Sequence, residues 1–390
     1  MQLGAGPVQR RLVEHIQAAG LEVIVVDRAE APAGWRPDAV HVRAPIDAPG
    51  QIVRSLHAAL ERHADLEVAA VLTSTDLGIA SVPPVAASLG LPHATLASIA
   101  SMEDKQRAKT ILGRAGIRVP GGGVGRTIAD VELPDEDAEV VVKPVDSSGS
   151  RGVRRARGRI DVERAITHAL SFSNRFLIEE CIEGLHLDVN GFVVDGVFEL
   201  ASVGERYFTP APSCVPLYGG IVLDVDSVRS ALITRTMQRA VEAFGYRSGP
   251  VKADAIETPG GLVLLELAAR FHGDVLSTHA AEASGQAPAA IHWLARLGLC
   301  PRPSDHPAQG AWFAVFADRP GEIASITGVD AFRASEGYRH WIPRLHPGDA
   351  VRAPEDNRAL VGFGLLGFER EVDLWRETRA HRAAIEVLIV

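Results

Sequence analysis

The chain has 390 residues and a formal net charge of −9, a length that predicts two or three domains and a charge that excludes a broad nucleic-acid-binding surface. Hydrophobic residues make up 46% and charged residues 23%, an ordinary globular composition. The sequence has no apolar run of about 18 residues, so no membrane-spanning segment is expected. Three cysteines are too few for a disulfide framework and predict a cytoplasmic protein.

The N-terminal region alternates helical and strand patterns. Residues 8–19 and 52–63 have the helical spacing of apolar residues, whereas residues 21–27 and 68–73 are short apolar runs typical of buried strands. This alternation predicts a parallel α/β sheet up to about residue 97.

The first turn of the chain imitates a dinucleotide-binding fingerprint, with Gly4 and Gly6 followed by Asp27 after the next strand. Only Met1 to Leu3 precede this turn, so either the first strand is very short or the natural chain begins upstream. Gln9 replaces the third glycine of the fingerprint, which argues against nicotinamide binding.

The middle of the chain contains further strand and helix patterns. A helix is expected over residues 102–115, with Ser101 as its N-cap. A tight turn at Asp195-Gly196 is expected to join strands 187–194 and 197–203 into a hairpin. The other expected elements are strands 140–144, 176–179, 251–257 and 262–267 and helices 161–171, 227–244 and 373–384.

A lysine at the end of a strand precedes a loop rich in serine and glycine. Lys143 ends the strand 140–144, and the backbone N–H groups of the loop can close on phosphate oxygens. The Walker pattern does not fit, because its lysine follows the glycines. A flexible hairpin loop is the alternative. The loop residues expected to contact a nucleotide are Ser147, Ser148, Gly149 and Ser150.

Paired acids end the strand 176–179, about 35 residues after Lys143. Glu179 and Glu180 are followed by the short apolar segment that contains Ile182. Such a segment can present backbone groups to the edge of an adenine ring. Two glutamates at a strand end are also typical of a solvated surface, so the sequence leaves both interpretations open.

Two carboxylates interrupt adjacent apolar strands. Asp254 lies on the strand 251–257 and Glu266 on the strand 262–267, so a hairpin sets them side by side. Such a pair is costly unless a cation neutralises it, and Mg²⁺ prefers oxygen ligands. Arg270 follows four residues after Glu266 and can clamp a transferred phosphoryl group. A salt-bridged pair at a sheet edge is the alternative.

In this order and spacing, the three patterns resemble the ATP-grasp superfamily over roughly residues 1–300. The resemblance implies that Lys105 and Lys143 bind ATP. It implies that Glu179, Glu180 and Ile182 form the adenine hinge.

The same resemblance implies that Asp254 and Glu266 hold Mg²⁺, with Mn²⁺ as a possible substitute. Arg270 and Lys143 are then the catalytic residues. Two positions depart from the superfamily pattern. Ala268 stands where a metal-binding Asn is frequent, and His186 stands at the position of the ribose-binding acid, for which Asp188 is the expected substitute.

Within the superfamily, residues 265–274 and the C-terminal module resemble the L-amino-acid ligases and related carboxylate–amine ligases. The segment 205–220, with three prolines and three aromatic residues, predicts a long functional loop. If these residues do not contact substrate, the pocket is expected near Thr75 and Asp76. The expected substrate-binding residues are Arg206, Tyr207, Arg270, Gly273 and Asp274.

The predicted architecture is an ATP-grasp fold of the α/β class, with α+β character in its ATP-binding lobes. It has a parallel N-terminal α/β domain (residues 1–97), an ATP-grasp region (98–305, with a lid lobe over about 118–180) and a small C-terminal module (306–390). The expected activity joins a small carboxylate, for example an amino acid, to an amine through an acyl phosphate. A carboxylase that uses bicarbonate and an inactive nucleotide-binding protein are the alternatives. A homodimer is left open, and no nucleic-acid or membrane partner is expected.

Overall fold

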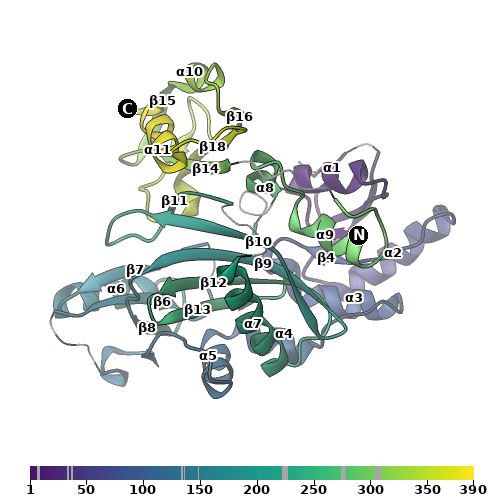
Figure 1. Cartoon of the computed structure of the whole chain (residues 1–390), viewed down its shortest axis with the longest axis horizontal. Coiled ribbons are helices and arrows are strands. Elements are labelled where there is room, and N and C mark those ends of the chain that lie inside the picture. The colour runs from purple at the N-terminus through teal and green to yellow at the C-terminus, as the bar shows by residue number, and fades with distance from the viewer. Residues whose placement is uncertain are drawn as a thin grey trace.

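The computed structural model spans residues 1–390 and describes all of them except 7–8, 33–34, 37, 133–134, 136, 148, 222–226, 274–277 and 304–308. In the described part of the chain the strands form four sheets, one of them parallel, with helices around them (Figure 1). This mixed arrangement confirms the predicted α/β class. None of the helices in the described ranges is long and apolar enough to cross a lipid bilayer.

The N-terminal sheet is parallel and has the order β3-β2-β1-β4, as the alternating pattern predicts. One buried stripe of α1, made of Leu12, Val13 and Ile16, faces the core. The Asp27 carboxylate accepts the backbone N–H groups of Ala5 and Ala29, so it caps the surrounding turns. The elements are β1 (Gln2–Leu3), β2 (Ile24–Asp27), β3 (Val40–Arg43), β4 (Leu72–Thr73), α1 (Arg10–Ala18), α2 (Pro49–Arg62) and α3 (Val82–Ser88).

The predicted helix 102–115 is wrong in its start, because two helices meet at Asp104. Helix α4 (Leu96–Glu103) ends there and α5 (Lys105–Arg114) begins. The Asp104 side chain accepts the N–H of Arg107 and caps α5, whereas Ser101 bonds back to the carbonyl of Ala97 inside α4. The break places Lys105 in the first turn of α5.

The smaller antiparallel sheet, here called the lid sheet, has the order β5-β8-β6-β7. Helix α6 covers one face and buries Val162, Ala165, Ile166 and Ala169 against it. The elements are β5 (Gly122–Gly125), β6 (Glu139–Pro144), β7 (Arg154–Arg157), α6 (Arg159–Leu170) and β8 (Phe176–Glu180).

The large sheet contains eight described strands in the order β13-β12-β9-β10-β11-β14-β18-β16, and each adjacent pair in it is antiparallel. The predicted hairpin is confirmed, because Asp195 (φ 55°) and Gly196 (φ 86°) both adopt the left-handed conformation that a type I′ turn requires. The strands are β9 (Leu185–Val194), β10 (Val197–Phe208), β11 (Pro216–Ile221), β12 (Gly249–Thr258), β13 (Gly261–Ala268), β14 (Gln309–Phe316), β16 (Tyr338–Pro343) and β18 (Leu360–Phe368).

The predicted long loop over residues 205–220 is wrong. Strand β10 continues to Phe208 and pairs with β11, with Tyr207 opposite Tyr218. Aromatic residues favour paired strands, and two of the three prolines fall in the short connection between β10 and β11 while the third, Pro216, begins β11. These residues are therefore positioned by a sheet.

Three C-terminal strands, β14, β16 and β18, extend the large sheet beyond β11. The sheet therefore continues across the boundary expected near residue 305. A separate three-stranded sheet has the order β17-β15-β19. The remaining elements are α7 (Val228–Ala243), α8 (Ala280–Ala283), α9 (Ala289–Arg296), β15 (Gly321–Thr327), α10 (Val329–Arg333), β17 (Ala350–Val351), α11 (Leu374–Ala383) and β19 (Glu386–Ile389).

Candidate active site

The serine- and glycine-rich loop is anchored by Lys105. The ammonium group of Lys105 donates to the carbonyl oxygens of Val145 (3.2 Å) and Ser147 (2.9 Å). Three described loop residues have left-handed backbone angles, Gly149 with φ 68°, Ser150 with φ 60° and Gly152 with φ 76°. Ser148 lies outside the described residues. Two sequence-predicted groups, the first lysine and the loop, are therefore in direct contact.

The buried Glu179 carboxylate lies between two lysines. Lys143 Nζ is 2.8 Å from Glu179 Oε2, and Lys109 Nζ contacts Glu179 Oε1. Burial lowers the pKa of Lys109 to about 8, although Glu179 opposes the shift. Sequence reasoning missed Lys109, yet it follows Lys105 by four residues and therefore lies on the same face of the helix.

The predicted hinge begins within β8, whose last two residues are Glu179 and Glu180. The Glu180 carboxylate accepts a hydrogen bond from the backbone N–H of Gly121 at 2.9 Å. The backbone N–H of Glu180 in turn donates to the Gly121 carbonyl. The N–H of Cys181 donates to the Glu139 carbonyl, and Ile182 is half-buried. Glu180 thus fixes the start of the hinge through its side chain, whereas its expected contact with a nucleotide stays a prediction.

Three carboxylates form a row across the large sheet. Asp254 on β12 is in register with Glu266 on β13 and with Asp188 on β9. Because cross-strand partners project from the same face, the three side chains come together. The side-by-side arrangement of Asp254 and Glu266 expected from the sequence is therefore present.

Lys252 neutralises the Asp254–Glu266 pair from the same strand face. Its Nζ is 3.2 Å from Asp254 Oδ1 and 2.9 Å from Glu266 Oε1, and the lysine side chain is 4% exposed. Burial alone would raise the pKa of the Glu266 carboxyl, but Lys252 and Lys105 outweigh it and lower the pKa to about 2. Burial is outweighed at Asp254 too, where Lys252 and Arg206 hold the pKa well below its usual range. Both acids are therefore ionised at neutral pH.

Asp188 contacts Arg206 and His272 inside the sheet. Arg206 Nη2 is 2.5 Å from Asp188 Oδ1, and His272 Nε2 is 3.5 Å from the same oxygen. His272 also contacts Asp254 Oδ1 at 2.7 Å. Because Asp188 is 2% exposed, its geometry favours orienting Arg206 and His272. The ribose contact expected for it stays a prediction.

Asp188, Asp254 and His272 each offer one ligand atom within 4.8 Å of the others, so they are a second candidate metal set beside Asp254 and Glu266. The backbone N–H of His272 donates to Asn190 Oδ1 at 2.8 Å, which fixes this residue from behind. Sequence reasoning missed His272, although it lies two residues after Arg270 within the segment that carries the resemblance.

The Arg270 side chain reaches the N-terminal domain. Its Nε donates to Asp76 Oδ1 at 2.7 Å, and its Nη1 donates to the carbonyl of Phe271. A side chain added at Gly273 would meet nothing within 4 Å, so this residue borders open space. Asp274 lies outside the described residues. Arg270 thus contacts Asp76, one of the two residues near which the alternative substrate pocket is expected.

Two of the expected substrate residues are held by other contacts. Tyr207 stacks on Tyr218 at 4.7 Å between ring centroids and meets the edge of Trp375, a residue of α11, at 5.1 Å. This arrangement anchors α11 to β10 and β11. The Arg206 guanidinium faces Asp188 and lies 5.2 Å from the Phe208 ring. Their contact with a substrate stays a prediction.

The lid sheet touches the C-terminal part of the chain near the serine- and glycine-rich loop. Arg154 Nη2 on β7 is 2.8 Å from Glu355 Oε1, and the Arg358 guanidinium lies 5.7 Å from the centre of the Phe172 ring. A side chain added at Gly149 would meet Asn357 at 3.9 Å. The lid sheet is therefore closed against the segment that precedes β18.

Only four of the 40 basic residues in the chain are lysines, and all four belong to this site. Lysine carries a compact point charge, whereas arginine carries a flat fork of donors. The four are linked electrostatically: in addition to burial, Lys143 and Lys252 lower the pKa of Lys105, and Lys143 lowers the pKa of Lys109. The lysines are Lys105, Lys109, Lys143 and Lys252.

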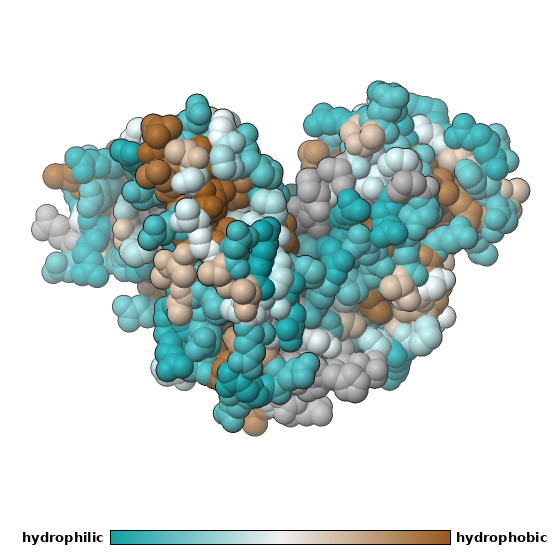
Figure 2. All heavy atoms as spheres, turned by 90° about the horizontal axis from the view of Figure 1, so that it is seen from above, coloured by the Kyte–Doolittle hydropathy of each residue, from teal (hydrophilic) through white to brown (hydrophobic). Residues whose placement is uncertain are grey.

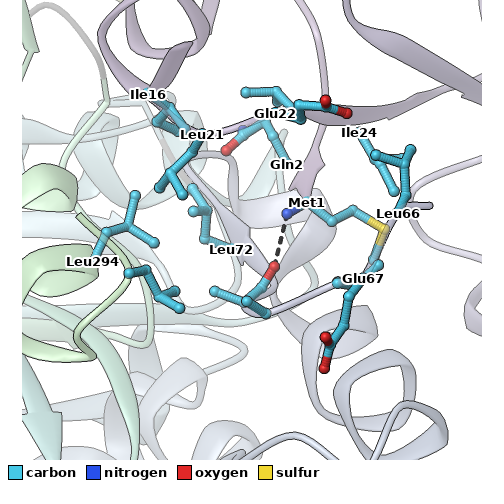
Figure 3. Close-up of a pocket in the computed structure, with 15 residues that line it drawn as sticks. Met1, Gln2, Ile16, Leu21, Glu22, Ile24, Leu66, Glu67, Leu72 and Leu294 are labelled. Carbon is cyan, nitrogen blue, oxygen red and sulfur yellow. Dashed lines mark hydrogen bonds between the residues drawn. The ribbon is translucent and has the colours of Figure 1, made fainter. Parts of the chain in front are cut away.

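A partly open cavity of about 120 Å³ lies elsewhere, between the N-terminal sheet and α9. Ile16, Leu72 and Leu294 point into it, and the Met1 amino group bonds to the Ala70 carbonyl beside it (Figure 3). No lysine or carboxylate of the candidate site lines this cavity. The molecule is also hollowed between two large masses (Figure 2). The site described above is therefore separate from the cavity beside α9.

Comparisons with known proteins agree with this geometry. Residues 102–274 match the model of the ATP-grasp domain, and residues 314–390 match L-amino acid ligase C-terminal domain 2. An uncharacterized protein, y4rH of Sinorhizobium fredii, is 23% identical over 318 residues, which are 76% of this chain and 63% of that protein. The chain thus spans less than two thirds of this curated relative.

Solved structures resemble the whole chain. The L-amino acid ligase from Bacillus licheniformis superimposes with a TM-score of 0.80 at 16% identity, covering 100% of this chain and 98% of that one. The biotin carboxylase from Campylobacter jejuni, solved as a β,γ-ATP complex, gives 0.63 at 15% identity, covering 99% and 91%. These values establish a shared ATP-grasp fold.

Residues 102–274 thus carry an ATP-grasp domain and the whole chain has the ATP-grasp fold, as its lysines, lid sheet and carboxylate pair indicate. Its C-terminal residues add a narrower match. Within the superfamily it resembles the L-amino acid ligases, which confirms the resemblance drawn from the sequence.

Proposed function

We propose that the chain is an ATP-dependent carboxylate–amine ligase. The observation that carries the proposal is a cluster of four lysines around buried carboxylates. Lys252 contacts Asp254 and Glu266, and Lys109 and Lys143 contact Glu179. The fourth lysine, Lys105, holds the serine- and glycine-rich loop. The lysines supply fixed positive charge for phosphate groups, as phosphoryl transfer requires. The C-terminal domain match favours an amine as the second substrate over bicarbonate.

The residues present fit Mg²⁺. Asp254 and Glu266 are 22% and 32% exposed at their side chains, and both are ionised, so they offer the hard oxygen ligands that Mg²⁺ takes. When bound, the ion would supply positive charge across the phosphates. Asp254 and Glu266 are the residues that would hold it.

The reaction can be written so that every atom is accounted for. A carboxylate oxygen of the acid attacks the γ-phosphorus of ATP, and the bond from that phosphorus to the bridging oxygen breaks to release ADP. The amine then attacks the acyl carbon, inorganic phosphate leaves with the bond electrons, and the nitrogen loses a proton. Lys143 and Arg270 would stabilise the charge that spreads over the transferred group.

The contacts of the lid sheet support a mechanism that excludes water. An acyl phosphate hydrolyses if water reaches it, so the loop must close over the reacting groups. In this structure the loop is held on one side by Lys105 and faces the segment around Asn357 on the other. Closing the loop would therefore protect the intermediate.

The test is release of inorganic phosphate that depends on both substrates. Purified protein with MgATP would be screened against pairs of amino acids and, separately, against bicarbonate. Hydroxylamine should trap the activated acid as a hydroxamate when the correct acid is present. Phosphate release with bicarbonate alone would favour a carboxylase, and no release with any pair would favour an inactive nucleotide-binding protein.

Substrate choice is expected to depend on the segment after Arg270. Gly273 borders open space, and Asp274 follows it in the sequence. Replacement of Asp274 by Asn should change which acid or amine is accepted, with little effect on the KM for ATP. An unchanged preference for acid and amine would indicate that the substrate pocket lies near Thr75 and Asp76 instead.

A further inference from the structure

Lys252 lies between the two carboxylates that are expected to hold metal. Its ammonium group is 3.2 Å from Asp254 Oδ1 and 2.9 Å from Glu266 Oε1. The side chain is 4% exposed, so the surrounding sheet fixes this position. A positive charge thus already bridges the pair from its buried side.

The residue opposite Lys252 in the sheet offers no metal ligand. Lys252 on β12 is in register with Ala268 on β13. A methyl group can neither coordinate a cation nor compete with the ammonium for the carboxylates. Where the superfamily pattern frequently has a metal-binding Asn, this chain has Ala268, and the cross-strand neighbour Lys252 contacts the carboxylates instead.

The carboxylate oxygens are divided between two sides. Within the described part of the chain, Lys252, Arg206 and His272 contact only one oxygen of each acid, Asp254 Oδ1 or Glu266 Oε1. Since both acids are partly exposed, the second oxygen of each is left for a cation on the open side. That arrangement provides for one ion and leaves no second set of oxygens.

We propose that Lys252 takes the place of one of two metal ions at Asp254 and Glu266, so that the chain binds its nucleotide with a single divalent cation. The inference rests on the nucleotide site of the proposed function. Paired metal ions in two-metal sites lie roughly 3.5–4 Å apart. An ammonium bonded to both carboxylates occupies the buried half of such a site.

The test counts bound Mn²⁺, which can substitute for Mg²⁺ and is visible by electron paramagnetic resonance. The protein is saturated with a non-hydrolysable ATP analogue, and bound Mn²⁺ is measured by rapid filtration and by its spectrum. Wild type should bind one ion per chain and show no exchange coupling. The double variant K252M/A268N, which removes the ammonium and restores an amide oxygen, should bind two ions with the spectrum of a coupled pair.

Single variants separate the two contributions. A268N alone should still bind one ion, because Lys252 remains between the carboxylates. K143M should weaken binding of the analogue at least tenfold and leave the metal count unchanged, since Lys143 contacts Glu179 rather than the acid pair. A coupled pair of ions in wild type would overturn the inference even if the double variant failed to fold.

The outcome also distinguishes this inference from the proposed function. If wild type binds no ATP analogue, the proposed ligase activity fails. If it binds the analogue together with two ions, only the role of Lys252 fails. One ion in wild type and still one in a correctly folded K252M/A268N would also contradict it, because the ammonium would then not be what excludes the second ion.

Discussion

Arg206 and Asp188 form a buried ion pair in the middle of the large sheet, with Arg206 Nη2 2.5 Å from Asp188 Oδ1 and the two side chains 11% and 3% exposed. The same nitrogen is 3.3 Å from Asp254 Oδ1. One guanidinium therefore connects a fully enclosed carboxylate to a carboxylate of the candidate metal pair.

We expect Arg206→Met to destabilise the fold by about 3–5 kcal/mol, because it leaves Asp188 buried without its cation. Urea unfolding followed by circular dichroism measures the change. R206M/D188N should recover part of the loss, since the unpaired charge is removed as well. Arg164→Met is the matched control, because its partner Asp161 and the arginine itself are 61% and 74% exposed, and it should change stability by less than about 0.5 kcal/mol.

Lys143→Ala should abolish turnover and weaken nucleotide binding at least tenfold while the fold stays intact. Lys143 provides one of the two positive charges beside Glu179, and its loss removes a phosphate-binding charge without opening a large apolar cavity. Isothermal titration with an ATP analogue gives the affinity, and circular dichroism checks the fold. Unchanged kinetics at limiting ATP would contradict the proposal that Lys143 binds the nucleotide.

Glu266→Ala should lose activity that excess Mg²⁺ does not restore, because a metal-binding oxygen pair is removed. The sequence predicts a milder effect on activity for Asp254→Ala. For stability we expect the larger loss in Asp254→Ala. Asp254 Oδ1 contacts Lys252, Arg206 and His272, whereas Glu266 contacts Lys252. Thermal melting should therefore show D254A below E266A. Equal melting temperatures would indicate that Lys252, Arg206 and His272 find other partners.

Stability should fall as the pH drops from 7 to 5. Burial, reinforced by Arg11, lowers the pKa of His279 to about 3, whereas an unfolded histidine titrates near 6.5. The unfolded chain then binds more protons in this range, so acid favours unfolding, by up to about 1.4 kcal/mol per pH unit. The nearby groups are Arg11, Glu14, His15, Glu282 and His340.

The measurement is the free energy of unfolding in urea at several pH values. His279→Asn should flatten the slope between pH 7 and 5 by about 1 kcal/mol per pH unit. His63→Asn changes an exposed histidine and should leave the slope unchanged. Equal slopes in wild type and H279N would mean that His279 is not buried in its neutral form.

Local patterns predicted much of the site because the relevant residues interrupt apolar strands. Asp254, Glu266 and Lys143 stand at positions where a polar residue in a buried run needs a partner. The turn at Asp195-Gly196 could also be predicted, since few residue pairs other than Asp-Gly or Asn-Gly adopt the left-handed conformation at both positions.

The parts that the sequence did not reveal depend on register and tertiary packing. Lys252 also interrupts an apolar strand, but its role follows only from its pairing with Ala268. Tyr207 could have faced a substrate, and only the docking of α11 brings Trp375 against it. Asp104 ends one helix and caps the next because its side chain bonds to Arg107, a choice that helical periodicity alone does not show.

The confinement of lysine to one place makes the protein unusually simple to label. An amine-directed acylating reagent modifies most proteins at many exposed ε-amino groups, but this chain has four, all of them in the site. Burial lowers the pKa of Lys109 to about 8, so this lysine should react near neutral pH, where a larger fraction of it is uncharged than in an ordinary lysine. Peptide mapping of acylated protein with and without nucleotide would therefore record occupancy directly, with no engineered reporter on the chain.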